Sequence, residues 1–364
     1  MYKIPKFKVD EDAHFRTLNI RVKELMQEFL KGKPIETSFK DGTKVLVQLE
    51  PDSCKHSLAR DWLQRCVDND RELRRLLCGD FAEQRRLIKE VYTDSPDHFR
   101  RIFNRNAPSS IKNASQPYFM DCFHEIMRHI FVDRLFEGKY NETHPMDKDS
   151  FVESLDLLLC PYCGDTYIRK SVRTAHGRVH EVSPSLDHFL PKSIYPFLAL
   201  NCYNLIPACA ACNLSPNKGI ADPLGADKRH EYLMNPYQFR DDAFDFGYSL
   251  NGVKYYEENN YDVLFFYHGN NDLMKGYQEL MTTESHYKNN HRHTVGEIFR
   301  SFVNQAKTAR QFYKGVHIPE QYWVENAESV LRFPLRTPYD IEQPAYKLQK
   351  DLYEKMKEQD WDEL

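Results

Sequence analysis

The chain has 364 residues, of which 41% are hydrophobic, and its formal net charge is -4 at pH 7. This length allows two or three globular domains, and the hydrophobic content is sufficient for packed cores. The slightly negative charge excludes a protein coated in positive potential, so we expect any contact with nucleic acid to be local.

Helical periodicity dominates the N-terminal part of the sequence. Residues 1–55 are mixed, with a short strand of a hairpin expected at residues 44–49. From residue 56 to residue 137, apolar residues recur at every third or fourth position between charged residues. A further helix is expected at residues 118–136. We therefore predict a mainly helical N-terminal domain over residues 1–137.

The pattern of the C-terminal part, residues 238–364, changes to strands and then to helices. Three strands are expected, at residues 244–248, 253–256 and 263–267. Helices are expected at residues 271–284 and 291–312, and the tail at residues 346–361 is amphipathic. Together with the N-terminal helices, these elements predict an α+β protein.

The nine cysteines indicate a reducing compartment. Five of them stand singly in the sequence, namely Cys54, Cys66, Cys78, Cys122 and Cys202. An odd number of mostly isolated cysteines is unlike a disulfide framework. Residues 1–8 lack the apolar segment of a secretory signal, and prolines and asparagines interrupt the most apolar stretch, residues 194–212. We expect a soluble, cytoplasmic protein without a membrane segment.

The other four cysteines form two CxxC pairs with 45 residues between them. They are Cys160, Cys163, Cys209 and Cys212. Four thiolates at this spacing can surround one tetrahedral Zn²⁺, and Gly164 suits the tight turn after the second ligand. Such an ion would contribute folding energy. The alternatives are two unrelated pairs or a redox dithiol, whose usual βαβ context is absent. His176 and His180 are not expected as ligands, because four cysteines already complete the set.

A second candidate site lies between the cysteine pairs. The carboxylate of Asp187 is a good ligand for Mg²⁺, and the adjacent His188 can take a proton from an attacking water molecule. Both can serve one centre near the end of a strand. An Asp-His pair alone is a weak signal, but its position inside the segment closed by the cysteines strengthens it. Asn204 and Asn213 follow in the sequence and are further candidates for this site. Their alternative roles are turn formation and helix capping.

Together, these motifs resemble the cysteine-stapled form of the HNH endonuclease family. The similar positions span about 60 residues and comprise Cys-Pro-Tyr-Cys-Gly from Cys160, residues 186–193, residues 204–207, Cys-Ala-Ala-Cys-Asn from Cys209, and Lys218-Gly219. The resemblance implies a ββα-metal finger within an HNH nuclease core at residues 150–237. In such a finger, a hairpin and a helix clasp one divalent ion.

The resemblance also implies a role for each residue of the second site. Asp187 and Asn213 would hold the catalytic ion, His188 would be the general base, and Asn204 would fix the loop that orients this base. The final position is Asn213 where the name-giving pattern has a histidine. Because a carboxylate and an amide oxygen form an all-oxygen site, Mg²⁺ or Mn²⁺ is favoured there.

Because of Pro216, the sequence does not define where the helix at the second cysteine pair begins or whether it includes Asn213. A proline is disfavoured inside a helix that has already begun at Cys209. Either the helix starts late, with Ser215 as its N-cap, or Asn213 lies just outside it.

The charge of the motif region supports contact with phosphates. Residues 160–218 contain six basic and three acidic side chains, which gives +3 locally against -4 for the whole chain. The candidate nucleic-acid contacts are Lys218, Lys192, Arg169, Arg173 and Arg178. For the arm that carries the three arginines, an ordinary exposed hairpin is the alternative.

The sequence thus predicts a DNA endonuclease with a structural Zn²⁺ and a catalytic Mg²⁺ or Mn²⁺. The family context includes HNH subunits that work beside an ATPase in Septu-like bacterial anti-phage defence, so a partner protein is expected. One alternative is a catalytically silent, zinc-stapled scaffold that binds nucleic acid or protein. The presence of all four residues of the second site argues against this alternative. Another is an RNA nuclease or a junction resolvase on the same finger.

Overall fold

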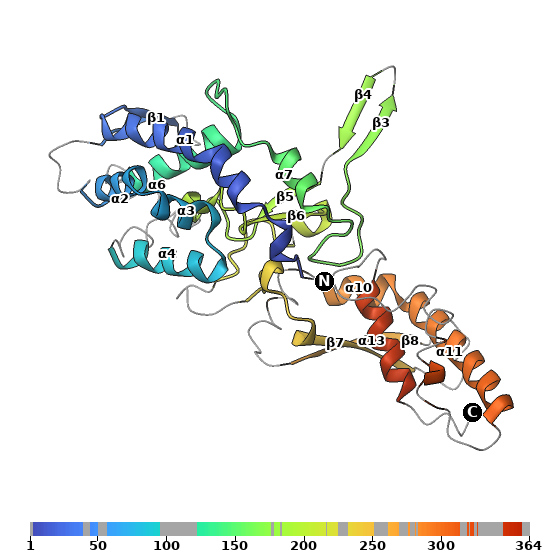
Figure 1. The fold of residues 1–364 in the computed structure, drawn as a ribbon. Coiled ribbons are helices and arrows are strands. Elements are labelled where there is room, and N and C mark those ends of the chain that lie inside the picture. Colours follow the sequence, from blue (N-terminus) through green and yellow to red (C-terminus); the bar gives the residue numbers. More distant parts are fainter. Residues whose placement is uncertain are drawn as a thin grey trace, which may run out of the picture. The chain divides into compact units, whose positions relative to one another are not determined.

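The structure is a computed structural model of the chain (Figure 1). It describes residues 3–38, 44–49, 57–94, 122–175, 178–182, 184–215, 217–224, 232–250, 261–268, 276, 281, 283–313, 319, 321–323, 326 and 345–358. The chain separates into two compact units, each of which is assembled from distant segments. The helical unit contains Phe7–Asp156 and Leu186–Ile206, and the cysteine unit contains Met1–Lys6, Leu157–Ser185 and Pro207–Leu364.

The longest helix of the helical unit is α1, Glu11–Leu30, which packs against α2 (Ser57–Asp68) and α3 (Asp70–Cys78). The side chain of Asp10 caps α1 by accepting a hydrogen bond of 2.8 Å from the backbone N–H of Ala13. The buried face of α1 consists of Phe15, Leu18, Val22, Leu25, Met26 and Phe29. These residues recur at helical spacing, so the prediction of mixed structure for residues 1–55 overlooked a readable helix.

The helix expected at residues 118–136 is described from Cys122 onward and has two parts. An α-helix, α6 (Cys122–Met127), continues into a π-helix, η5 (Arg128–Phe136). The remaining α-helices among the described residues of the unit are α4, Phe81–Asp94, and α7, Lys148–Leu155.

Two small sheets accompany these helices. Strands β1 (Ile35–Ser38) and β2 (Lys44–Val47) pair antiparallel, which confirms the strand expected at residues 44–49. Strand β5 (Ser185–His188) pairs with β6 (Leu205–Ala208). The 3₁₀ turn η6 at Pro196–Leu198 lies in the loop between β5 and β6.

The C-terminal part of the cysteine unit is built on the antiparallel hairpin of β7 (Phe244–Leu250) and β8 (Tyr261–Tyr267). Helices α10 (Thr283–Asn290) and α11 (Arg292–Tyr313) pack on β8, and α13 (Tyr346–Lys357) packs on β7 and α11 (Figure 1). These elements confirm two predicted strands and the helix at residues 291–312. The strand expected at residues 253–256 and most of the helix expected at residues 271–284 lie outside the described residues.

The shorter elements are a second hairpin and several single turns. Strands β3 (Ser171–Ala175) and β4 (Arg178–Val182) pair antiparallel. The turns are η1 (Lys6–Lys8), α8 (Ala210–Asn213), η7 (Pro236–Gln238) and η8 (Asp241–Ala243).

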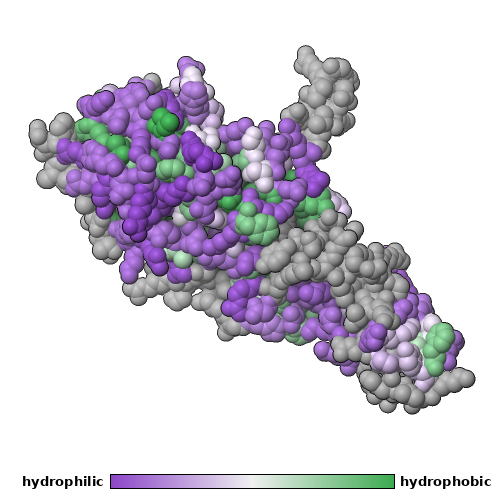
Figure 2. All heavy atoms as spheres, viewed as in Figure 1, coloured by the Kyte–Doolittle hydropathy of each residue, from purple (hydrophilic) through white to green (hydrophobic). Residues whose placement is uncertain are grey.

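The fold is therefore mostly helical, with small two-stranded sheets, and this confirms the α+β class. The division into three domains stays a prediction from the sequence. On the face shown in Figure 2, the described surface of the helical unit is mainly hydrophilic, with isolated hydrophobic spots. Among the helices of the described residues, none is both long and apolar enough to cross a membrane.

Candidate metal centre and candidate active site

The first cysteine pair lies on a tight turn of the cysteine unit. The backbone N–H of Gly164 donates to the carbonyl of Cys160 at 2.6 Å, and the N–H of Cys160 donates to the carbonyl of Thr166 at 2.9 Å. Gly164 adopts a φ of +64°, a left-handed conformation that costs glycine little. The turn therefore directs the side chains of Cys160 and Cys163 to the same side, as a zinc knuckle requires.

The second pair lies at the start of α8. Cys209 is the N-cap residue of this short helix and Cys212 lies within it. The N–H of Asn213 donates to the carbonyl of Cys209 at 3.0 Å, and the chain becomes extended at Leu214. Asn213 is thus the last residue of the helix. This arrangement differs from both of those considered for Pro216, which itself lies outside the described residues.

The structure brings all four cysteines together. Their Sγ atoms lie within 4.8 Å of one another, and the four residues are between 0% and 7% exposed. Tetrahedral zinc with Zn–S bonds of about 2.3 Å places its sulfur atoms about 3.8 Å apart, so small side-chain rotations suffice to close the site. The predicted four-cysteine cluster is confirmed, and its donor set fits zinc.

The electrostatics of the cluster also favour a cation. Hydrogen bonds from the neighbouring thiols hold the pKa of Cys163 well below its usual value and lower that of Cys209 to about 7. Burial raises the pKa of Cys160, and hydrogen bonds with the other three thiols raise that of Cys212. Without a cation, the four thiols therefore cannot all ionise, whereas a bound dication stabilises four thiolates.

The candidate active site centres on His188, the last residue of β5 in the helical unit. Its Nε2 lies 3.0 Å from the backbone carbonyl of Ala199, which can only accept a hydrogen bond. Nε2 therefore carries a proton, so in the neutral imidazole the lone pair is on Nδ1. The edge of the ring packs against Phe136, with the ring centroids 4.4 Å apart. Both contacts fix the imidazole in an orientation in which Nδ1 is the basic atom.

Asn204 holds the loop that carries this carbonyl. Its Oδ1 accepts from the N–H of Leu190 at 2.7 Å, while its Nδ2 donates to the carbonyls of Leu190 at 3.1 Å and Leu198 at 3.0 Å. The residue is 0% exposed, so water cannot replace these bonds. Leu198 immediately precedes Ala199, the acceptor for His188. The side chain of Asn204 thus fixes the two ends of the loop on which the histidine depends.

Asp187 precedes His188 on β5 and is 4% exposed. The two residues lie at a strand end, where the sequence analysis expects a shared centre. Asn213, the other predicted ligand of the catalytic ion, is partly exposed and belongs to the cysteine unit. The pairing of Asp187 with Asn213 around one ion therefore stays a prediction from the sequence.

The predicted phosphate contacts differ in their surroundings. Lys192 forms an ion pair with Glu137 that lowers the pKa of that carboxyl, and its Nζ lies 4.7 Å from the ring centroid of Phe136. Lys218 is 1% exposed, a burial that weighs against a contact with phosphate. Arg169 is exposed. The side chains of Arg173 and Arg178 lie outside the described residues.

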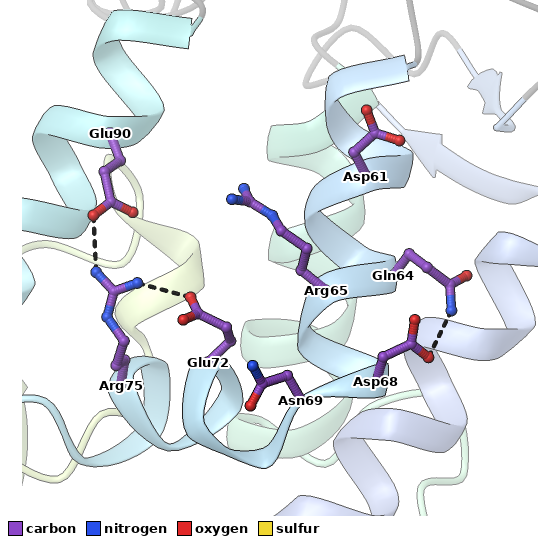
Figure 3. Close-up of a pocket in the computed structure, with 8 residues that line it drawn as sticks. All are labelled: Asp61, Gln64, Arg65, Asp68, Asn69, Glu72, Arg75 and Glu90. Carbon is purple, nitrogen blue, oxygen red and sulfur yellow. Dashed lines mark hydrogen bonds and ion pairs between the residues drawn. The ribbon is translucent and has the colours of Figure 1, made fainter.

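The helical unit also carries a polar groove of about 690 Å³ (Figure 3). Its lining residues are Asp61, Gln64, Arg65, Asp68, Asn69, Glu72, Arg75 and Glu90. Arg75 donates to Glu72 at 2.7 Å and to Glu90 at 2.8 Å. With four acidic and two basic residues, the groove has a net charge of -2, so it does not suit a phosphate backbone.

Asp165, His286 and His291 also come together in the cysteine unit. No motif in the sequence singles out these residues. His286 is 121 positions away from Asp165, so no local spacing indicates the cluster. The signal that the sequence does contain is two histidines five positions apart after a predicted strand, which is weak by itself.

Comparison with protein-family models, with curated proteins and with solved structures finds no match to this chain.

Proposed function

We propose that this protein is a metal-dependent endonuclease of the HNH type that hydrolyses phosphodiester bonds in DNA. The observation that supports this proposal most strongly is the setting of His188. A histidine whose Nε2 donates to a backbone carbonyl has, in its neutral form, the lone pair on Nδ1 and is then suited to act as a general base. Its neighbour Asp187 supplies a carboxylate, a group that hard divalent ions prefer.

In the proposed reaction, Nδ1 of His188 takes a proton from water as the water oxygen attacks the phosphorus. The hydrogen bond to Ala199 stabilises the imidazolium that forms, because Nε2 continues to donate to this carbonyl. Asp187, together with Asn213 as the resemblance implies, would hold Mg²⁺ or Mn²⁺. A bound divalent ion supplies positive charge for the pentacovalent transition state and for the leaving oxygen.

The four-cysteine cluster has a separate, structural role in this proposal. A Zn²⁺ on Cys160, Cys163, Cys209 and Cys212 would tie the turn at residues 160–164 to α8. A closed set of four protein ligands leaves no position for substrate, so the ion supports folding rather than chemistry. From the resemblance, we also propose an ATPase-type partner in bacterial anti-phage defence.

The test is a cleavage assay with zinc quantified on the same sample. Supercoiled plasmid, single-stranded DNA and RNA are incubated with the protein in Mg²⁺, in Mn²⁺ and in EDTA. We expect nicking or linearisation of plasmid that EDTA abolishes. Asp187→Asn should require a higher Mg²⁺ concentration, whereas Asp149→Asn, an exposed change on α7, should not.

Each other result has a defined meaning. Cleavage of RNA but not DNA would replace the substrate and keep the mechanism. Cleavage that persists in EDTA would contradict the metal-dependent mechanism. A zinc-loaded protein that cuts none of the three substrates, alone or with bacterial lysate and ATP added to supply a partner, would contradict the proposal and leave the non-catalytic scaffold.

A further inference from the structure

A second cluster of metal-binding side chains lies in the cysteine unit. Asp165 comes two residues after Cys163, His286 lies on α10, and His291 lies between α10 and α11. One potential ligand atom from each residue lies within 4.8 Å of the other two. Two imidazoles and one carboxylate are a common ligand set for zinc and for other divalent transition metals.

The geometry around Asp165 is specific. Its Oδ2 lies 2.7 Å from Nε2 of His286, and its Oδ1 lies 3.2 Å from Nε2 of His291. The centroids of the two imidazole rings lie 6.1 Å apart, and the ring planes are inclined at 63° to each other. The Nε2 atoms of both histidines therefore face the same carboxylate, so side-chain movements within this cluster would place all three groups around one ion.

The contacts of His291 suit a metal ligand. Its Nε2 is buried, yet it makes no hydrogen bond of acceptable geometry with the described residues. Its other ring nitrogen, Nδ1, faces Oγ1 of Thr294 at 3.4 Å. The tautomer of His291 that donates from Nδ1 to Thr294 presents the lone pair of Nε2 to the side on which the carboxylate lies. A metal ligand requires this tautomer.

The surroundings hold the cluster in place. The hydroxyl of Tyr287 donates to the carbonyl of Cys163 at 2.5 Å, which ties α10 to the knuckle that precedes Asp165. Nδ2 of Asn290 lies 3.0 Å from Nδ1 of His286 and donates to it in this placement. Flipping the amide would present its oxygen to Nδ1–H instead, the arrangement of the outer partners of metal-bound histidines.

We infer that Asp165, His286 and His291 form a second divalent metal site, for Zn²⁺ or a similar transition metal. Three protein ligands leave a coordination position for solvent. The side chain of His286 is 31% exposed, so solvent reaches this side of the cluster. The inference rests on residues of the cysteine unit alone, so it stands or falls independently of nuclease activity.

Co²⁺ distinguishes the two sites by their donors. Metal-free protein is titrated with Co²⁺ in excess Mg²⁺, which fills the oxygen-ligand site proposed at Asp187, while absorbance and bound Co²⁺ are measured. We expect two Co²⁺ per chain, one with intense thiolate charge-transfer bands and one with only the weaker bands of nitrogen and oxygen ligands. His286→Ala and His291→Ala should each reduce the number from two to one and leave the thiolate bands unchanged.

The matched control is His293→Ala, which removes an exposed histidine two positions from His291. It should still bind two ions. Unchanged thiolate bands in each variant show that the cysteine unit is folded. A wild-type protein that binds one Co²⁺ with thiolate bands only would overturn the inference, as would two bound ions in both His286→Ala and His291→Ala.

Discussion

The four-cysteine cluster and the loop of His188 are positioned by different forces. The cysteines converge through two local turns, but their sulfur atoms would repel one another once ionised unless a cation were bound between them. His188 and Asn204 are held by neutral hydrogen bonds to backbone groups of the same loop. The proposed zinc centre would therefore be lost with its ion, whereas the loop of the candidate active site is preorganised by the chain itself.

The largest expected effect comes from breaking the cysteine cluster. Cys212→Ser removes one thiolate from the closed set, so the protein should lose the thiolate-bound metal and the melting temperature should fall by about 10 °C or more. Cobalt absorbance and calorimetry measure both quantities. Cys66→Ser changes a buried cysteine outside the cluster and should retain the metal. Full metal binding in Cys212→Ser would contradict the cluster's dependence on its ion.

A smaller effect is expected from the loop. Asn204→Ala removes three side-chain hydrogen bonds and leaves buried backbone groups unpaired, which should cost about 3 kcal/mol of unfolding free energy. Because the carbonyl that orients His188 is then less fixed, cleavage by the folded protein should fall at least about tenfold. Urea unfolding and cleavage rates at a temperature below the transition check both effects.

Asn201 offers the matched control for this experiment. Its Nδ2 donates to the carbonyls of Leu76 at 2.8 Å and Gly79 at 3.0 Å, so Asn201→Ala also leaves buried groups unpaired. It should destabilise the protein to a similar extent while the cleavage rate stays near that of the wild type. Equal losses of activity in both variants would show that Asn204 acts only through stability.

The smallest effect concerns pH. Burial, together with the nearby Arg134 and Arg128, lowers the pKa of His129 to about 4 in the folded protein. The unfolded chain, with an ordinary pKa near 6.5, binds this proton first, so stability should be lost as the pH falls from about 6.5 towards 4. We expect a loss of about 2 kcal/mol that His129→Gln reduces. Identical urea midpoints against pH in both proteins would contradict this assignment.

The sequence predicted features whose signals are local. Two CxxC pairs sufficed for the cysteine cluster, and residue alternation sufficed for β7 and β8. Residues 128–136 looked like an ordinary helix, because a π-helix differs from it in hydrogen-bond register rather than in apolar pattern. The cluster at Asp165 was not predictable, because only the tertiary fold brings α10 to the first cysteine pair.

The candidate active site also combines local signals, which the sequence shows, with tertiary contacts, which it does not. The order of Asp187, His188 and Asn204 along the chain gave rise to the resemblance to the HNH pattern. No pattern could show that Nε2 of His188 binds Ala199, because a backbone carbonyl leaves no signature in the residue types. The burial of Lys218 was missed because a lysine in a loop is usually exposed.

The most direct test of the proposed nuclease compares two histidines of the helical unit that bind adjacent carbonyls. Nε2 of His188 bonds to Ala199 at 3.0 Å, and Nε2 of His14 bonds to Leu200 at 2.7 Å. The measurement is the rate of plasmid cleavage in Mg²⁺ by His188→Ala and by His14→Ala, both loaded with zinc. If His188 is the general base, its removal lowers the rate by about 10²- to 10⁴-fold while His14→Ala cleaves within a few-fold of the wild type. Equal rates in the two variants would contradict the account.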